Sequence, residues 1–379
     1  CRSSRHQPAD RGGSQANAVV RPTLRPPAAI NGRRLDPNRL RIVHMSTTTT
    51  LIIPIPYELA HSEVRLTGRA TLHELPSVSH LLTPPAEPTI FGMPTVAIVP
   101  EDRVSESIRA TLPHWYNLES VIIAEFSIDH DTASRIASEA NPTFPGGPNP
   151  LIREECRAQA TELAYTIQQA LALAAPGAFK TYPAWVRTHL DKNATEVGPC
   201  LNYALTDAAA LARNQGWPQL KTLRLDSVMR WFMRLSWLPH HAGESALSRA
   251  YNALTHVIHA EHSEAEHALF YAMIGLEALY GGERESVFRT IQDRVNATLG
   301  APTTFRRALS KMYDIRSRFV HGSLPFYPFH RPDEPSSSAE QEIDVAANTA
   351  IAVLAASLQK LIDTDSSSLR FTVTAEPVH

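Results

Sequence analysis

Cysteine is scarce in this chain of 379 residues. The three cysteines, Cys1, Cys156 and Cys200, lie far apart and form no C-x-x-C pair. This spacing excludes a zinc ribbon, whose metal is held by closely paired cysteines, and it excludes the disulfide framework of a small secreted domain. Cys156 recurs at helical spacing with apolar neighbours, so we expect it to be buried. So few cysteines suit a reducing, cytoplasmic compartment.

The chain also lacks a long uncharged apolar run. Its most apolar stretch, Ile343–Ile362, contains Asp344, Asn348, Gln359 and Lys360. Because a membrane-spanning helix needs about 20 predominantly apolar residues, we interpret this stretch as an amphipathic helix of a soluble protein and expect no membrane association. Hydrophobic residues still make up 43% of the chain, which is enough to bury a core.

No strong excess of charge of either sign is present, since the formal net charge is −2. This balance argues against a protein that coats polyanions with a broad basic surface. Residues 1–44 nevertheless hold nine Arg and only two Asp, and they are rich in Pro, Gly and Ser. We expect this segment to be disordered. It is either a basic nucleic-acid-binding arm or the product of a misassigned start before Met45, and we favour the second.

Proline divides the chain into two parts. Eighteen of the 29 prolines lie within residues 1–150, whereas none lies between Pro239 and Pro302. Since proline inside a helix breaks it, the proline-free part is predicted to be helical and the first part to consist of strands and turns. The expected fold class is α+β, with an N-terminal β-containing region followed by an all-α helical bundle.

Local patterns predict the individual elements. Short runs rich in β-branched residues predict strands at Leu51–Ile55, Glu63–Leu72, Thr95–Val99 and Ser120–Ile128. Helical spacing of apolar residues predicts helices at Leu151–Ala174, Leu201–Asn214, Ser245–Ala260, Ser263–Tyr280, Glu285–Leu299, Thr304–His321 and Ala339–Ile362, while Leu220–Leu238 fits either state. The predicted organisation is a β-containing region at 45–140, a Pro/Gly linker at 141–150, a helical connecting region at 151–240, a helical domain at 241–365 and a tail at 366–379.

The predicted helix Thr304–His321 carries an arginine on its apolar face. The apolar stripe runs through Phe305, Leu309, Met312, Tyr313, Phe319 and Val320. At about 100° per residue, Arg316 falls on this stripe. A guanidinium on a buried face needs an anionic partner, because burying an unpaired charge costs several kcal/mol. Glu277 flanks the apolar stripe of helix Ser263–Tyr280, so it is either the partner of Arg316 or an ordinary solvated glutamate.

The same helix ends in a histidine that is followed by a glycine. Gly322 is the usual residue type just beyond a helix C-terminus, which places His321 at the helix end. There the helix dipole favours the imidazolium and the ring can project outward. Arg316 and His321 could together clamp a phosphate and move a proton, the two demands of phosphodiester cleavage. The alternative is a salt-bridged core arginine followed by a C-capping histidine.

These residues resemble a known family. Tyr313–Gly322, Y-D-I-R-S-R-F-V-H-G, has the Arg-x4-His spacing of HEPN domains and looks like the version found in Apea-like HEPN proteins of bacterial defence systems. Ala272–Tyr280, A-M-I-G-L-E-A-L-Y, is similar to a helix of that group with a Leu-Glu-Ala-Leu core. The resemblance covers about Ser245–Ile362. It implies an all-α HEPN-like bundle that forms a homodimer, with the Arg-His helices of two subunits meeting at a composite cleft.

The resemblance further implies metal-independent RNA cleavage without a cofactor, in antiviral or toxin-like defence. His321 would be the general acid or base on the RNA 2′-hydroxyl and the leaving oxygen, and Arg316 would hold the scissile phosphate. Tyr313, Ser317 and Arg318 complete the motif as supporting residues. Active members commonly have Asn, Asp or His at the position of Ser317, so the alternative is a non-catalytic HEPN module for dimerisation or for nucleotide or RNA binding.

Histidines gather where two predicted helices meet, at His256, His259, His262 and His267. His259 and His262 are three residues apart and could ligate a metal together with Glu266, which would make the protein a metal-dependent hydrolase. The chain contains no H-E-x-x-H motif, and the cluster spans a predicted turn. We therefore expect exposed histidines at helix ends and no metal site.

Overall fold

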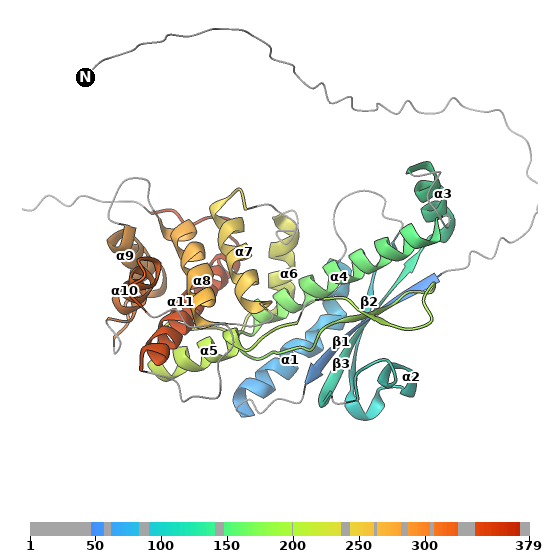
Figure 1. The fold of residues 1–379 in the computed structure, drawn as a ribbon, viewed down its shortest axis with the longest axis horizontal. Helices are drawn as coiled ribbons and strands as arrows, with labels where there is room; N and C mark the ends of the chain where they lie inside the picture. The colour runs from blue at the N-terminus through green and yellow to red at the C-terminus, as the bar shows by residue number, and fades with distance from the viewer. Residues whose placement is uncertain are drawn as a thin grey trace, which may run out of the picture. The chain divides into compact units, whose positions relative to one another are not determined.

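The computed structural model describes residues 47–56, 62–82, 91–114, 116–140, 148–198, 200–235, 243–260, 264–281, 287–303, 307–324 and 338–371. All of them belong to one compact unit, residues 44–379. An antiparallel sheet comes first and helices dominate afterwards, so the predicted α+β class is confirmed (Figure 1). The predictions for residues 1–44, for the linker at 141–147 and for the tail beyond Phe371 lie outside the described residues.

The elements follow one another in a simple order. The strands are β1 (Thr47–Pro56), β2 (Thr95–Pro100), β3 (Leu118–Ile128), β4 (Trp185–Arg187) and β5 (Thr195–Glu196). The α-helices are α1 (Ser62–Val78), α2 (Glu106–Arg109), α3 (His130–Ala140), α4 (Asn149–Ala174), α5 (Ala204–Gln215), α6 (Leu225–Arg234), α7 (Ala246–Ile258), α8 (Ala265–Tyr280), α9 (Val287–Leu299), α10 (Ala308–Val320) and α11 (Ser338–Asp363). Two short 3₁₀ turns, Ser79–Leu82 and Glu101–Arg103, complete the described part.

The described strands form one antiparallel sheet in the order β2-β3-β1-β4-β5. β1 is central, and its Leu51 lies opposite Ala124 of β3 and Val186 of β4. The Thr- and Ile-rich sequence of β1 suits a strand with neighbours on both sides. Its two prolines, Pro54 and Pro56, lie beyond the stretch that pairs with β4. The N–H that each proline lacks is therefore not needed for a hydrogen bond to β4.

One predicted strand is wrong. Glu63–Leu72 belongs to α1, and the buried side chains of this helix include Leu72, Leu75 and Val78, which recur at helical spacing. The alternation of Val, Leu and Thr resembles a strand, but this segment is a helix whose buried residues pack into the core against one face of the sheet. The strands predicted at Leu51–Ile55, Thr95–Val99 and Ser120–Ile128 are confirmed as parts of β1, β2 and β3.

The helical predictions agree with the structure to within a few residues at each end. All seven predicted helices are present as α4, α5 and α7 to α11, and the ambiguous stretch Leu220–Leu238 contains α6. The sequence patterns missed α2, α3, β4 and β5. α2, β4 and β5 are very short, and an element of two to four residues is too brief to show a period.

The middle of α11 is buried on all sides, whereas its first turns expose Gln341, Asp344 and Val345. Every side chain from Thr349 to Gln359 is buried, and α11 packs against α5, α7, α8 and α10. It is the helix of the described chain that is long and apolar enough to cross a membrane, yet 83% of its apolar window is buried inside the protein. This burial is what the core helix of a soluble protein shows.

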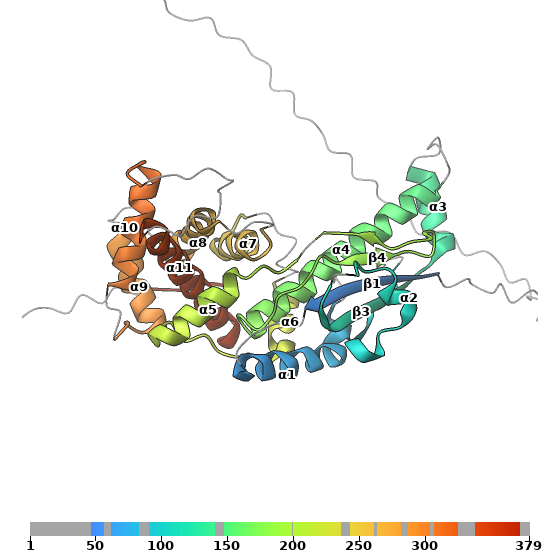
Figure 2. The ribbon, with the colours of Figure 1, turned by 60° about the horizontal axis from the view of Figure 1, so that its bottom comes forward.

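α4 connects the sheet with the helices around α11. It packs against β1 and α1 as well as α6 and α11, and both views show it running from the sheet to the helices (Figures 1 and 2). Every residue of its last two turns, from Thr166 to Ala174, is buried. One apolar core consequently continues from the sheet face through α4 to α11.

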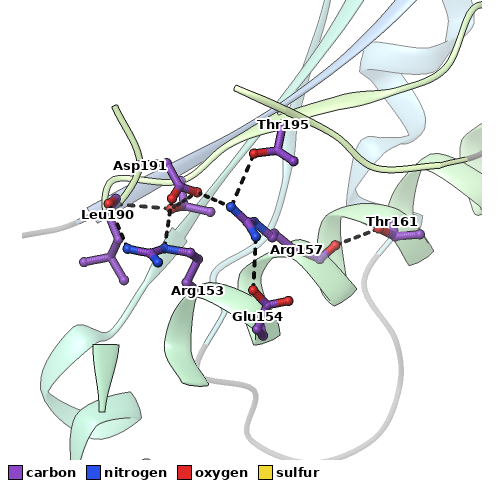
Figure 3. Close-up of polar contacts among 8 residues, drawn as sticks. Arg153, Glu154, Arg157, Thr161, Leu190, Asp191 and Thr195 are labelled. Carbon is purple, nitrogen blue, oxygen red and sulfur yellow. Dashed lines mark hydrogen bonds and ion pairs between the residues drawn. The ribbon is translucent and has the colours of Figure 1, made fainter. Parts of the chain in front are cut away.

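The first half of α4 is held to the edge of the sheet by ion pairs. Asp191, in the loop between β4 and β5, pairs with the Arg153 Nε at 2.8 Å and with an Nη of Arg157 at 3.3 Å (Figure 3). The Thr188 hydroxyl donates to the same carboxylate at 2.9 Å, and Arg157 also pairs with Glu154. Because Asp191 is mostly buried, this shared carboxylate ties the edge of the sheet to α4.

The buried C-terminus of α4 needs partners for its last carbonyl groups. The Gln359 side chain on α11 donates to the carbonyl oxygens of Leu173 at 2.8 Å and of Lys221 at 2.7 Å. Its amide oxygen accepts from the Lys221 N–H at 2.9 Å, and the Leu223 N–H donates to the Ala174 carbonyl at 2.8 Å. One amide group thus joins α4, the segment before α6 and α11.

Gln359→Ala should lower the free energy of unfolding by about 3 kcal/mol, because it leaves the buried carbonyls and N–H it now binds without partners. Gln341→Ala, at an exposed position of the same helix, is the matched control and should change stability by less than about 0.5 kcal/mol. Urea unfolding measures both. Equal stabilities for the two variants would show that the Gln359 bonds do not hold the fold together.

Candidate functional site

α10 packs on α11 through a narrower face than the sequence pattern indicated. Its buried residues are Leu309, Met312 and Ile315, whereas Val320, which was assigned to the apolar stripe, is 48% exposed. The buried face of α10 therefore includes Ile315 and leaves Val320 out. Arg316 lies at the edge of this face and not, as the sequence pattern indicated, at its centre, and at the edge a charged group can keep some contact with water.

Arg316 forms an ion pair with Glu277 of α8, which is one of the two alternatives that the sequence left open for Glu277. The distance from an Arg316 Nη to a Glu277 Oε is 3.1 Å, and the two side chains are 25% and 29% exposed. The Arg316 Nε is buried and has no hydrogen-bond acceptor among the described residues. Glu277 therefore anchors one end of the guanidinium and neutralises its charge, while the role of Arg316 in cleavage stays a prediction.

His321 lies at the C-terminal cap of α10, as predicted. Gly322 has a left-handed φ of +68°, which glycine adopts without strain. The Gly322 N–H donates to the Phe319 carbonyl at 3.1 Å and the Ser323 N–H to the Arg318 carbonyl at 2.7 Å, which together form a Schellman motif. His321 itself is exposed, so its imidazole is available to a ligand.

The other motif residues have different surroundings. The centres of the Tyr313 and Phe288 rings are 4.8 Å apart. The guanidinium carbon of Arg316 lies 5.9 Å from the centre of the Tyr313 ring. Arg318 forms a surface ion pair with Asp314 at 3.6 Å. Ser317 contributes its carbonyl to the helix end, where it accepts from the His321 N–H. The structure thus places Glu277, Arg316 and Tyr313 together and leaves Arg318 on the solvent side.

The histidine cluster does not form a metal site among the described residues, and His262 lies outside them. His259 caps α7, and its Nδ1 lies 2.9 Å from the Cys200 carbonyl oxygen. Its Nε2 is covered and has no hydrogen-bond partner in the described chain. Burial lowers the pKa of His259 to about 4, so its imidazole is neutral at pH 7.

Sequence reasoning missed the aromatic surroundings of these histidines. The Tyr165 ring of α4 meets the His259 ring edge to face at 4.9 Å, and the Tyr271 ring of α8 stacks on His256 at 4.7 Å. Tyr165 is more than 90 residues away from His259 in the chain. No local pattern could have indicated that these rings meet.

Removing the anion beside Arg316 should destabilise the protein. Glu277→Ala should cost about 2 kcal/mol, a value between those of exposed and fully buried ion pairs, because both side chains keep partial solvent contact. Asp314→Ala breaks the exposed pair with Arg318 on the same helix and should cost less than about 0.5 kcal/mol. Urea unfolding of the Glu277→Ala, Arg316→Ala and double variants measures the energetic coupling between the two side chains. If the losses in free energy of unfolding of the two single variants add up to that of the double variant, the pair is not coupled and the prediction is wrong.

The buried neutral His259 should make stability depend on pH. Its folded-state pKa lies below the unfolded value of about 6.5, so the unfolded chain binds the proton first and stability falls between pH 6.5 and 4. From pH 7 to pH 5 the loss due to this group should be about 2 kcal/mol. His259→Asn should lose that part of the pH dependence, whereas His256→Ala, at an exposed histidine of α7, should keep it. Identical pH profiles for all three proteins would contradict the burial of a neutral imidazole.

No family model, curated protein or solved structure matches this chain. The similarity to Apea-like HEPN proteins rests on the residues of Ala272–Tyr280 and Tyr313–Gly322 alone. A function is therefore inferred from those residues and from the contacts of α8 and α10.

Proposed function

We propose that the protein is a metal-independent RNA endonuclease of the HEPN type that acts as a homodimer in the cytoplasm, in antiviral or toxin-like defence. The observation that carries the proposal is the end of α10. There Arg316, held by Glu277 of α8, precedes an exposed His321 at a Schellman-capped helix end. A positioned cation and an accessible imidazole are the groups that phosphodiester cleavage needs.

RNA supplies the nucleophile for this reaction. The neutral His321 imidazole takes the proton from the 2′-hydroxyl, the 2′-oxygen forms a bond to phosphorus, and the bond from phosphorus to the 5′-oxygen breaks. An imidazolium returns a proton to the leaving 5′-oxygen, so the products are a 2′,3′-cyclic phosphate and a 5′-hydroxyl. Arg316 offsets the charge that develops on the phosphate oxygens.

The helix geometry supports a dimer. Five residues along an α-helix correspond to a rise of about 7.5 Å and a rotation of about 140° from the first residue to the last. Arg316 and His321 of one chain therefore diverge from the helix axis in different directions. A cleft between two copies of α10 would let the cation of one copy and the imidazole of the other face the same phosphate.

A second function is favoured by the ion pair itself. Glu277 neutralises Arg316, and Ser317 stands where active HEPN members commonly have Asn, Asp or His. With these residues the same bundle could serve as a non-catalytic module for dimerisation or for binding RNA or nucleotides. Cleavage assays separate the two functions.

The purified protein should cleave single-stranded RNA in the presence of EDTA. The products should end in a cyclic phosphate, and an all-deoxy oligonucleotide should bind without being cut, because it lacks the 2′-hydroxyl. His321→Ala should reduce the rate at least about 100-fold, as expected for loss of a general acid–base group. Its melting temperature should stay close to that of the wild type, because His321 is exposed.

His267→Ala replaces another exposed histidine and should leave cleavage unchanged. Loss of RNA cleavage in EDTA with recovery on adding zinc or manganese, or cleavage of the deoxy oligonucleotide, would contradict the proposal. A stable dimer that cleaves nothing would favour the binding module.

A further inference from the structure

A cavity of about 250 Å³ lies between α1 and the sheet. Its walls come from α1, from the ends of β1 and β2, from the start of β3 and from residues 178–180, which follow α4. It is smaller than the sites of about 300–1,000 Å³ that bind drug-sized molecules, so it suits a small ligand. None of its described lining residues belongs to α8 or α10, and the proposed cleavage mechanism uses none of them.

The inner wall of the cavity is apolar. Ile55 of β1, Leu72 of α1 and Phe179 line it and are buried. Ile98 of β2 adds a fourth apolar side chain, which is half-buried. These side chains offer a hydrocarbon a surface from which water is displaced when the hydrocarbon binds.

The rim of the cavity carries basic side chains. Arg69 and His73 are four residues apart on α1, so they lie on the same side of that helix. Lys180 lines the cavity from the segment after α4. Arg69 and His73 are exposed and Lys180 is half-buried, so all three side chains are accessible to a ligand that enters from solvent.

The two sides of the rim are held close together by a glycine. Gly68 of α1 has no side chain, and a Cβ at this position would lie 3.1 Å from the Cβ of Ala178. The helix and residues 178–180 are therefore in direct contact beside Arg69. This contact lets Arg69 and Lys180 border the same small cavity.

One positive charge at the rim has no carboxylate partner among the described residues. The Arg69 Nε donates to a Glu119 Oε at 2.5 Å, so the charges of these two groups offset each other. Lys180 instead lies over an aromatic ring, with its Nζ 3.5 Å from the centre of the Tyr203 ring. A cation–π contact leaves the charge of the ammonium in place. The cavity thus combines an apolar wall with one uncompensated cation.

We propose that this cavity binds the anion of a small aliphatic monocarboxylic acid. The hydrocarbon chain packs against Ile55, Leu72 and Phe179, and the carboxylate lies at the rim. There it accepts hydrogen bonds from the Lys180 ammonium and from the Arg69 N–H groups that do not bond to Glu119. A phosphate ester fits less well, because its second negative charge finds no further cation at the described rim.

The proposal is independent of RNA cleavage, since it uses neither Arg316 nor His321. Isothermal titration of the full chain with acetate, butanoate, hexanoate, hexan-1-ol and hexyl phosphate at pH 7 tests it. Affinity should rise about fourfold for each CH₂ group that enters the cavity. Hexan-1-ol has the same chain length without the charge and should bind at least about tenfold more weakly than hexanoate.

Lys180→Gln should weaken hexanoate binding about tenfold and leave hexan-1-ol binding unchanged, because it removes the charge and keeps the apolar wall. Lys192→Gln, at an exposed lysine between β4 and β5, is the matched control and should bind hexanoate like the wild type. Ile98→Phe places a larger side chain in the cavity and should weaken hexanoate binding more than butanoate binding. His321→Ala should bind hexanoate normally, which separates this site from the proposed cleavage site.

Melting temperatures of the variants show whether each one is folded, and the Ile98→Phe result tests the site by itself if Lys180→Gln is unstable. Hexanoate binding that depends on chain length and on Lys180 supports the proposal. Absence of hexanoate binding at millimolar concentration, equal affinities for hexanoate and hexan-1-ol, or equal effects of Lys180→Gln and Lys192→Gln would overturn it. Tighter binding of hexyl phosphate than of hexanoate would overturn the assignment of the ligand as a carboxylate.

Discussion

The hydrogen bonds of Gln359 set the arrangement of the helices. α4 ends inside the core, where its last carbonyl groups cannot bond to water, and an unsatisfied buried carbonyl is costly. Gln359 supplies the donor for Leu173 and binds both backbone groups of Lys221. Because one amide group serves three segments, α11 must lie beside the end of α4. The sheet, which packs on α4, and the helices, which pack on α11, then share one core.

This core also decides which parts of the site are rigid and which are open. α8 and α10 both pack on α11, so the backbone positions of Glu277 and Arg316 are held by a helix whose middle, from Thr349 to Gln359, is completely buried. His321 lies one residue beyond α10, where the chain leaves the core through the left-handed Gly322. The guanidinium of Arg316 is thus fixed on a rigid scaffold, whereas the imidazole of His321 lies at an exposed helix end.

The protein uses histidine in two contrasting environments. His321 is exposed at a helix end, where its ring is open to solvent and to ligands. His259 has its ring nitrogens enclosed, bonds to the Cys200 carbonyl and has a pKa lowered to about 4. The imidazole of His321 is accessible to a ligand, whereas that of His259 is neutral at pH 7. The two roles follow from solvent access and not from the residue type.

The sequence by itself determined the α+β class, seven of the eight helices from α4 to α11 and the His321–Gly322 helix end. These features follow from local periodicity and from proline and glycine placement, whereas the sequence left open whether Glu277 pairs with Arg316. Only the tertiary structure decided that Glu63–Leu72 is a helix, that Ile315 is buried in place of the exposed Val320, and that Tyr165 of α4 meets His259. The physical reason is that burial and hydrogen-bond partners come from segments distant in the chain. An alternating sequence such as Glu63–Leu72 fits two local conformations, and the packing available in the folded state selects one of them.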